Sequence, residues 1–284
     1  MTLSSEVSKS FNDIAIYYDN HAKVQQEIGA RLFSRLDYIK SSPRFILDLG
    51  CGTGGFSKLL KKKYPAATII AIDLAHNMLL RAQKKQRFYR HWSLINGDIL
   101  QLPIADNAIG LIFANQVIHW VKSLPALFTE LLRVMQPNGC LLFSTLGPET
   151  FKEIRQTWGT IDNYSHTNNF MDMHDLGDQL MTNAFLDPVV DMEMLTAHYQ
   201  SPSNLLISLK KQGVRNINKN RNPGLTSKSK LDAFYHAYDS LRTVSGKYPL
   251  TYEIIYGHAY KNSNEIFIPI AAVKKTTRDL SSIF

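Results

Sequence analysis

A glycine-rich turn after an apolar segment contains the residues whose types and spacing point most directly to chemistry. The segment FILDLGCGTGGF places Asp48 just ahead of this turn. Glycine follows at Gly50, Gly52 and Gly54, as is needed where a ligand approaches the backbone or φ is positive. Gly50, Gly52 and Gly55 also fit the GxGxxG pattern of dinucleotide sites. The turn alone leaves open a dinucleotide, a cofactor without phosphate, or an ordinary tight strand-to-helix turn.

Three aspartates distinguish these readings. A carboxylate at Asp48 would repel the phosphate that a helix N-terminus attracts, whereas S-adenosylmethionine has no phosphate and carries two cationic groups. Asp73, ending TIIAID, is placed to accept both hydroxyls of a ribose. Asp98, in INGDIL, can accept from an adenine amino group, with Ile99 beside the ring. Each aspartate alone also fits a helix cap or a turn, but together they favour S-adenosylmethionine over a nicotinamide cofactor.

The predicted cofactor site includes neighbours of these residues. Leu74 and Met78 follow Asp73 closely, and Asn115 ends a later apolar run, so it either contacts the cofactor or faces the substrate. The expected product of methyl transfer is S-adenosylhomocysteine. The complete predicted set is Asp48, Gly50, Gly52, Gly54, Asp73, Leu74, Met78, Asp98, Ile99 and Asn115.

A parallel sheet must position these residues. From residue 45 onward, short apolar runs alternate with longer amphipathic ones, which is typical of strands joined by crossover helices. Such a doubly wound α/β sheet binds its ligand beyond the C-terminal ends of the strands. We expect strands at residues 45–49, 68–72, 93–96, 108–114 and 140–145, and helices at residues 56–63, 75–84 and 124–135.

The remaining sequence extends one domain over residues 1–284. One or two helices are expected within residues 6–40, further helices at residues 149–158 and 174–182, and strands at residues 188–196 and 251–260. The expected parts are a helical cap (1–40), a cofactor-binding half (45–146), a substrate half (147–200), a basic helical insertion or lid (201–250), and a last strand with a tail (251–284).

Composition excludes several classes of protein. The chain has 284 residues, 44% of them apolar and 20% charged, which is typical of a globular protein. The longest apolar run, residues 266–273, is far shorter than the roughly 20 residues of a membrane span. The N-terminus lacks the apolar core of a secretory signal. Two cysteines give neither a disulfide framework nor a zinc knuckle, so we expect a cytoplasmic protein without a membrane partner.

The net charge of +8 is concentrated in one segment. Residues 201–250 contain nine cations and two anions, so this segment carries +7 of the total. A basic surface favours an acidic partner such as nucleic acid or an acidic protein. We expect the insertion to be a docking face.

The chain resembles class I S-adenosylmethionine-dependent methyltransferases, and more narrowly the malonyl-acyl-carrier-protein O-methyltransferases of biotin synthesis. The resemblance is carried by FNDIAIYYDNHAKVQ, LPIADNAIGLIFANQVIHW, LLRVMQPNGCLLFSTLGPETFKEIR, MDMHDLGDQL, DPVVDMEMLTAHY, LKKQGVRN, GLTSKSKL and YPLTYEIIYGHAYK. It implies a Rossmann-like seven-stranded sheet with N-terminal helices and a helical insertion before the last strand. The chain departs from the family at His119, where a residue such as Gln is expected, and at Asn12 and Asp13, which replace a Ser-Arg pair.

The resemblance also implies the reaction. The methyl acceptor is the free carboxyl of a malonyl thioester on acyl carrier protein, or on coenzyme A, and the methyl ester primes synthesis of the pimeloyl chain of biotin. That carboxyl is ionised at pH 7, because carboxyl pKa values lie near 4. The reaction therefore needs alignment and exclusion of water, not a general base.

Four residues are candidates for catalysis. A desolvated carboxylate favours an arginine partner, and Arg155 in ETFKEIR or Arg215 in GVRN can supply it, unless both are solvated surface residues. Tyr18, in the YYD motif, is expected to close over the methyl donor unless it is a core residue. His174 begins a helix and either contacts the malonyl group or caps that helix.

Two neighbouring residues follow the fourth expected strand. His119 is expected to face the substrate and Trp120 to be a core residue.

Other functions remain open at this point. An RNA methyltransferase would also use a basic face. However, the sequence contains no motif of stacking aromatic residues, so nucleic acid is not a favoured partner. Another small carboxylic acid as substrate, or a non-catalytic cofactor-binding regulator, are further alternatives. No HExxH motif or carboxylate cluster predicts a metal site.

Overall fold

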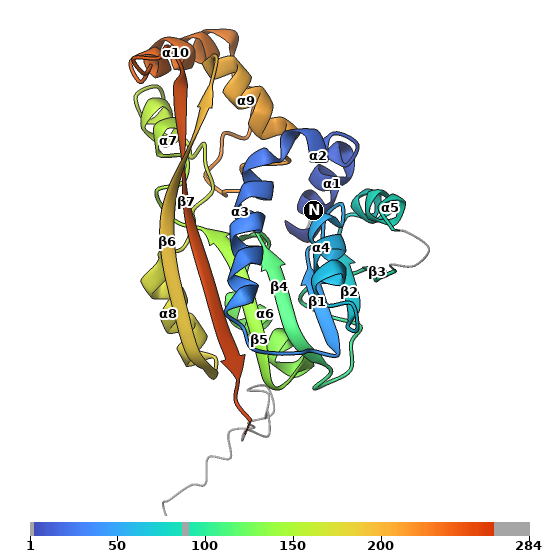
Figure 1. The fold of residues 1–284 in the computed structure, drawn as a ribbon. Helices are drawn as coiled ribbons and strands as arrows, with labels where there is room; N and C mark the ends of the chain where they lie inside the picture. The colour runs from blue at the N-terminus through green and yellow to red at the C-terminus, as the bar shows by residue number, and fades with distance from the viewer. Residues whose placement is uncertain (1–2, 87–90, 264–284) are drawn as a thin grey trace, which may run out of the picture.

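A seven-stranded mixed sheet runs through the structure, with helices on both faces (Figure 1). The structure is a computed structural model that describes residues 3–86 and 91–263. Strand order is β3-β2-β1-β4-β5-β7-β6, with β1 to β5 parallel and β7 antiparallel to both neighbours. This topology confirms the predicted doubly wound class I fold. The strands are β1 (Phe45–Leu49), β2 (Thr68–Asp73), β3 (Ser93–Asn96), β4 (Ile109–Asn115), β5 (Met135–Leu146), β6 (Phe185–Tyr199) and β7 (Tyr248–Lys261).

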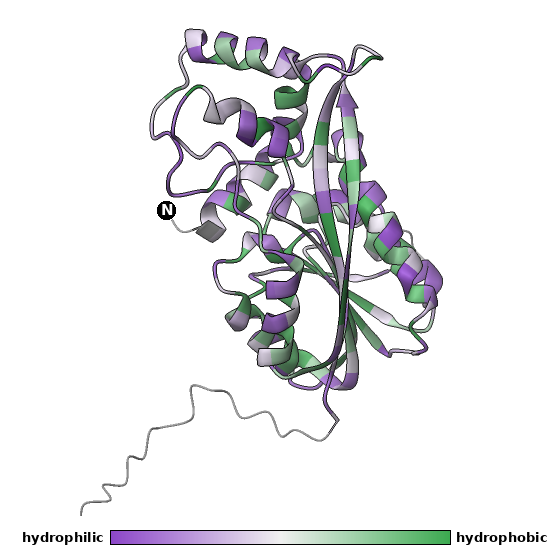
Figure 2. Ribbon diagram, turned by 90° about the vertical axis from the view of Figure 1, so that its left-hand side faces the viewer, coloured by the Kyte–Doolittle hydropathy of each residue, from purple (hydrophilic) through white to green (hydrophobic). Residues whose placement is uncertain are grey.

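Alternation along the central strands builds a core on each face of the sheet. In β4, Leu111 and Phe113 join one buried cluster, while Ile112 and Ala114 join the other, as the two-residue period of a strand requires. Figure 2 shows the lower strands as mostly hydrophobic and the helices beside them as mixed. The crossover helices are α4 (Gly55–Lys63), α5 (His76–Lys84) and α6 (Leu124–Val134).

The last two strands are much longer than the central ones and support a separate group of helices. Strands β6 and β7 have 15 and 14 residues, whereas β1 to β4 have at most 7. At their far end lie α7 (Lys152–Gly159), α9 (Pro202–Lys211) and α10 (Lys228–Asp239), while α8 (Met173–Thr182) packs along β6 (Figure 1). Buried Glu153 accepts a hydrogen bond from the Thr251 amide (3.0 Å), which ties α7 to β7.

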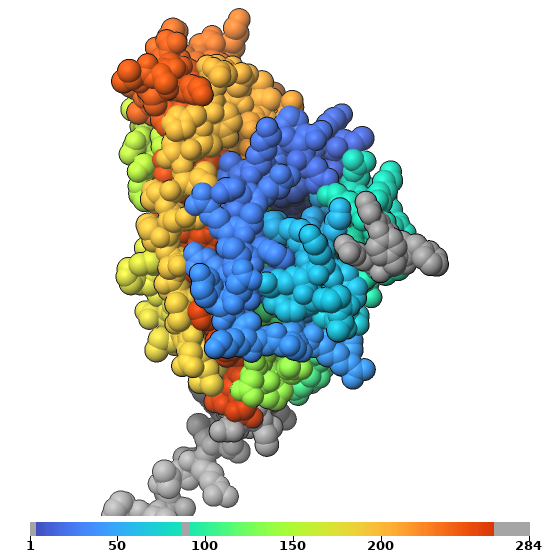
Figure 3. Space-filling view, viewed as in Figure 1, coloured from blue at the N-terminus to red at the C-terminus, as the bar shows by residue number. Residues whose placement is uncertain are grey.

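The N-terminal segment forms more helices than the one or two expected. Three α-helices, α1 (Leu3–Ile14), α2 (Tyr18–His21) and α3 (Lys23–Ser34), precede a short 3-10 helix (Arg35–Asp37), and a second 3-10 helix spans Ile118–Trp120. Helix α3 packs on the sheet through Ile28 and Leu32, which are fully buried. Figure 3 shows the surface hollowed between the N-terminal helices and the segment that contains α4 and α5.

Some expectations about the chain ends lie outside the described residues. The apolar run at residues 266–273 and the expected tail after residue 263 belong to this part of the chain. Within the described ranges, no helix combines the length and apolarity that crossing a membrane requires.

Helix α3 packs so closely against α4 and the end of β4 that Gly29 has no room for a side chain. A Cβ atom there would lie 2.2 Å from the Phe56 ring and 2.7 Å from Asn115 Nδ2. We expect Gly29→Ala to lower the free energy of unfolding in urea by about 1–3 kcal/mol, as overpacking does. Gly55→Ala is the control, because its added Cβ meets no atom within 4 Å. Equal stability of the two variants would contradict the close packing of α3.

Candidate functional site

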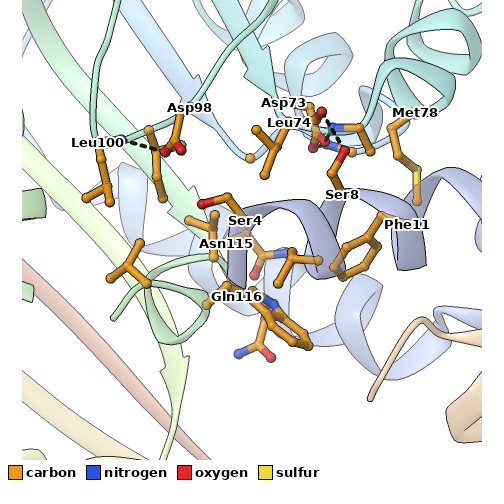
Figure 4. A pocket seen from close by; sticks show the side chains of 18 of the residues that line it. Ser4, Ser8, Phe11, Asp73, Leu74, Met78, Asp98, Leu100, Asn115 and Gln116 are labelled. Atoms are coloured by element: carbon orange, nitrogen blue, oxygen red, sulfur yellow. Dashed lines mark hydrogen bonds between the residues drawn. The ribbon is translucent and has the colours of Figure 1, made fainter. Parts of the chain in front are cut away.

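A cavity of about 260 Å³ lies beyond the C-terminal ends of the parallel strands, where the fold predicts a ligand. Its floor comes from the turns after β1, β2, β3 and β4, and α1 crosses it (Figure 4). We call it the donor cavity. Its lining residues are Ser4, Val7, Ser8, Phe11, Tyr18, Gly50, Gly52, Asp73, Leu74, Ala75, Met78, Asp98, Ile99, Leu100, Asn115, Gln116, Val117, Trp120, Val121 and Lys122.

Two glycines of the turn line the donor cavity, and a third allows close packing between helices. Gly50 and Gly52 line the donor cavity with φ values of 66° and 53°, a region in which residues with side chains are strained. A Cβ on Gly50 would also lie 2.5 Å from the Val117 side chain. Gly54 is the N-cap of α4 and packs against Ala82, and it is not part of the cavity lining.

Asp73 connects two turns at the floor of the cavity. Its Oδ2 accepts from the Gly52 amide and its Oδ1 from the Ala75 amide, both at 2.8 Å. Burial raises the pKa of this carboxyl to about 6. Each carboxylate oxygen can accept more than one hydrogen bond, so Asp73 retains acceptor capacity toward the cavity.

Asp98 and Asn115 mark the neighbouring strand ends. Asp98 Oδ1 accepts from the Leu100 amide at 3.0 Å (Figure 4). Asn115 Oδ1 accepts from Ser144 Oγ at 2.8 Å. Together with the glycine turn and Asp73, the structure brings eight of the ten predicted cofactor residues to the cavity: Gly50, Gly52, Asp73, Leu74, Met78, Asp98, Ile99 and Asn115.

Asp48 lies behind the glycine turn, outside the cavity lining. It is 2% exposed and accepts a hydrogen bond from the Ser57 hydroxyl on α4. Burial, reinforced by the negative charge of Asp73, raises the pKa of Asp48 to about 7. Its placement serves the junction of β1 and α4, and the predicted direct contact with a cofactor gains no support.

Helix α1 contributes lining residues that were not predicted from the sequence. Ser4, Val7, Ser8 and Phe11 line the cavity from α1 at helical i, i+3, i+4, i+7 spacing. That spacing is visible in the sequence, but it does not say what the helix face covers. Ser8 Oγ donates to the Leu74 carbonyl at 3.2 Å, which joins α1 to the end of β2.

Helix α2 is attached directly to the glycine turn. Asp19 accepts from Thr53 Oγ1 at 2.5 Å and pairs with Lys85 at 2.8 Å. This attachment places Tyr18 above Gly52, since a Cβ added there would lie 3.9 Å from Tyr18 Cε1. Burial, together with Asp73 and Asp19, raises the pKa of Tyr18, so its hydroxyl remains protonated.

A smaller cavity of about 40 Å³ adjoins the donor cavity. We call it the acceptor cavity. About 10–15 Å³ suffices for one water, so it has room for a small group. The two cavities share Phe11, Tyr18, Gln116 and Trp120 as walls; Trp120 is thus a wall residue and not the core residue expected. His119 lines the acceptor cavity, and burial lowers its pKa to about 3, which keeps the ring neutral.

A third cavity, of about 290 Å³, shares Phe151, Asn168 and Val214 with the acceptor cavity. We call it the insertion cavity, because α9 and the following loop line it. Arg215 and Lys210 belong to this lining. Arg215 is half exposed and pairs with Asp13 at 3.4 Å, so the structure places it outside the acceptor cavity.

Arg155 and His174 lie away from all three cavities. Arg155, on α7, donates from Nη1 to the Thr150 carbonyl at 3.0 Å, just before the start of that helix. The His174 side chain is 79% exposed, and its backbone amide donates to Asp172 Oδ1. Asp172 is therefore the cap of α8, in place of His174, and neither predicted catalytic role gains support from the placement of these residues.

Within the described parts of the chain, no group of three or more His, Cys, Asp or Glu side chains is arranged to hold a metal ion.

Comparison with known proteins gives consistent matches. A family described as "Methyltransferase domain" matches residues 47–143. A malonyl-[acyl-carrier protein] O-methyltransferase of Legionella pneumophila is 52% identical over 97% of this chain and 99% of its own length. The protein of that name from Gallionella capsiferriformans is 39% identical, over 95% and 94%.

Solved structures show the same fold at low sequence identity. The YcgJ protein from Bacillus subtilis aligns with a TM-score of 0.57 and 14% identity, covering 81% of this chain and 97% of that chain. A putative methyltransferase from Bacillus halodurans aligns with a TM-score of 0.56 and 16% identity, covering 82% and 98%.

The buried Asp48 carboxyl generates a prediction about stability and pH. Because its pKa is raised to about 7, the folded state binds this proton more tightly than the unfolded chain. The free energy of unfolding then falls as pH rises from about 4 to about 7. In Asp48→Asn this contribution disappears, and urea unfolding across that range should show a decline smaller by about 2–4 kcal/mol.

Asp232→Asn, at an exposed position of α10, is the matched control and should keep the wild-type slope. If Asp48→Asn keeps that slope too, the carboxyl is not buried in its uncharged form.

Proposed function

The chain belongs to the malonyl-[acyl-carrier protein] O-methyltransferase family, and from this premise we propose how its cavities act on a malonyl thioester. The protein is an S-adenosylmethionine-dependent methyltransferase. Its proposed acceptor is the free carboxylate of malonyl-phosphopantetheine on acyl carrier protein. The resulting methyl ester would prime the pimeloyl chain used for biotin.

One observation supports this proposal most directly: the donor and acceptor cavities meet at shared walls. Tyr18 and Gln116 border both spaces, and Phe11 packs edge-on against Trp120 at 5.5 Å beside them. A methyl group can pass between the two spaces only if the reacting atoms meet at this junction. Tyr18, with its protonated hydroxyl, is the proposed contact at that point.

The residues of the donor cavity fit S-adenosylmethionine. Asp73 retains acceptor capacity for the ribose hydroxyls, and Asp98 with Ile99 suits the adenine. Gly50 and Gly52 leave the backbone accessible to the methionine part. The negative charges of Asp73 and Asp98 also suit a cationic donor. No phosphate-binding cation is needed for this assignment.

Catalysis by this chain consists of holding and desolvating the reactants. S-adenosylmethionine bound in the donor cavity would supply a methyl group attached to sulfur. The malonyl carboxylate would accept this methyl group, and the C–S electron pair would return to sulfur. Helices α1 and α2 exclude water from the junction, since Ser8 and Asp19 attach them to the turns below. Opposite charges disappear in the reaction, so a dry cavity favours it over water, and alignment contributes about 7–11 kcal/mol at most.

The insertion is the proposed docking face for the carrier protein. Lys210 and Arg215 line the insertion cavity, next to the acceptor cavity, where a phosphopantetheine arm would enter. Among the described residues, Lys210, Lys211, Lys219 and Lys228 form no ion pair with a carboxylate. These free cations suit the arm phosphate and an acidic partner. The free, buried thiols of Cys51 and Cys140 accord with a cytoplasmic setting.

Labelled S-adenosylmethionine tests the substrate. Incubated with malonyl-acyl carrier protein, malonyl coenzyme A or total RNA, the enzyme should transfer label to the malonyl thioesters as a methyl ester.

Asp73→Ala should raise the dissociation constant of the donor about 10-fold or more, because hydrogen bonds to a charged acceptor are lost. Asp178→Ala, exposed on α8, is the control. Label in RNA alone would contradict the substrate, and donor binding without transfer to any acceptor would indicate a regulator.

Charge removal tests the docking face. Lys210→Ala and Arg215→Ala should each raise KM for malonyl-acyl carrier protein about 2- to 5-fold at low salt, the range of exposed ion pairs, and less at high salt. A short malonyl thioester without phosphate should show no such change. Lys58→Ala, exposed on α4, is the control. Equal effects on both substrates would contradict contact with the phosphate.

A further inference from the structure

We propose that uncharged carboxamides, those of Gln116 and Gln25, hold the malonyl carboxylate in the acceptor cavity in place of an arginine. The inference rests on the proposed function and names the residues that recognise its substrate.

The described lining of the acceptor cavity contains no formally charged side chain. It consists of Phe11, Tyr18, Gln25, Gln116, His119, Trp120, Leu146, Phe151, Asn168, Phe170, Gln212, Val214 and Tyr252. Burial keeps His119 neutral. A carboxylate in this space must therefore find its hydrogen-bond donors among neutral groups, of which carboxamides are the most numerous.

Gln116 presents a donor that the protein itself leaves unused. Its Nε2 is buried and has no hydrogen-bond partner. Figure 4 shows the Gln116 side chain extending away from Asp73 and Asp98, on the opposite side of the donor cavity. An unpaired buried N–H is costly, so a ligand acceptor at this position would remove that cost.

The backbone holds Gln116 in a strained conformation. Its φ is 58°, and its amide donates to both the carbonyl and the hydroxyl of Ser144, each at 3.1 Å. Left-handed backbone at a residue other than glycine is uncommon and is concentrated at functional sites. The same Ser144 hydroxyl donates to Asn115, so Ser144 positions both Asn115 and the wall residue Gln116.

Gln25 can present a second donor through a reversible chain of hydrogen bonds. Its Oε1 is buried without a partner, while its Nε2 donates to Gln212 Oε1 at 3.0 Å. Gln212 Nε2 in turn donates to the Ser208 hydroxyl at 2.8 Å. A hydroxyl both donates and accepts. If Ser208 donates instead and both amides rotate by a half-turn, Gln25 turns an N–H toward the cavity without loss of any bond in the chain.

Neutral donors suit this reaction better than a guanidinium. Negative charge on the carboxylate is consumed as the new C–O bond forms, so an arginine would stabilise the ground state more than the transition state. A guanidinium would also repel the sulfonium of the donor. Carboxamide N–H groups also orient the two carboxylate oxygens, but they stabilise the charged ground state less than a guanidinium would and do not repel the sulfonium.

Leucine substitutions test the proposal. Gln116→Leu and Gln25→Leu remove the amides at similar volume, and Gln156→Leu, exposed on α7, is the matched control. We expect kcat/KM for malonyl-acyl carrier protein to fall about 10- to 100-fold in Gln116→Leu, as for loss of a hydrogen bond to a charged group. The fall should be smaller in Gln25→Leu and absent in the control. Donor affinity by calorimetry should change less than about 3-fold.

Thermal unfolding separates this role from a structural one. Because Gln116 Nε2 is unpaired, Gln116→Leu should have a Tm equal to or above that of the wild type while its activity falls. A Tm that falls together with activity, or wild-type kcat/KM in Gln116→Leu, would overturn the clamp. A wild-type enzyme that methylates no malonyl thioester would overturn the proposed function as well, so the two failures are distinguishable.

Discussion

The carboxylate of Asp73 is the contact on which the candidate site depends. By accepting from the Gly52 and Ala75 amides, it joins the turn after β1 to the turn after β2. That junction determines where the glycine backbone faces the cavity and where α5 begins. The interaction requires burial of a carboxyl, and its raised pKa reflects the desolvation.

Charge is distributed in layers around the proposed reaction. Two aspartates and one lysine, Lys122, line the donor cavity. Neutral amides and aromatic rings line the acceptor cavity, and further cations line the insertion cavity. This order matches the proposed reactants, with the cationic methyl donor on one side and the phosphate of the phosphopantetheine arm on the other. The reacting carboxylate lies between them, where a low dielectric favours the disappearance of charge.

The long strands β6 and β7 make this layering possible. They extend beyond the parallel part of the sheet and support α7, α9 and α10, so the basic insertion is held beside the acceptor cavity. Contacts between the insertion and α1 complete the arrangement. Ser10 donates to the Gly213 carbonyl, and Arg215 pairs with Asp13.

The sequence by itself determined the parallel sheet, the glycine turn and the residues at the strand ends. These features depend on local periodicity and on the rule that parallel strands end at one edge, so Asp73, Asp98 and Asn115 could be placed before any coordinates were known. Only the tertiary structure decided what covers that edge and which side chains meet there. Gln25 and Gln116 are 91 positions apart in the chain, and their unpaired atoms become visible only after folding. Arg155, Arg215 and His174 have suitable chemistry, but their placement depends on packing between distant segments, which no local pattern encodes.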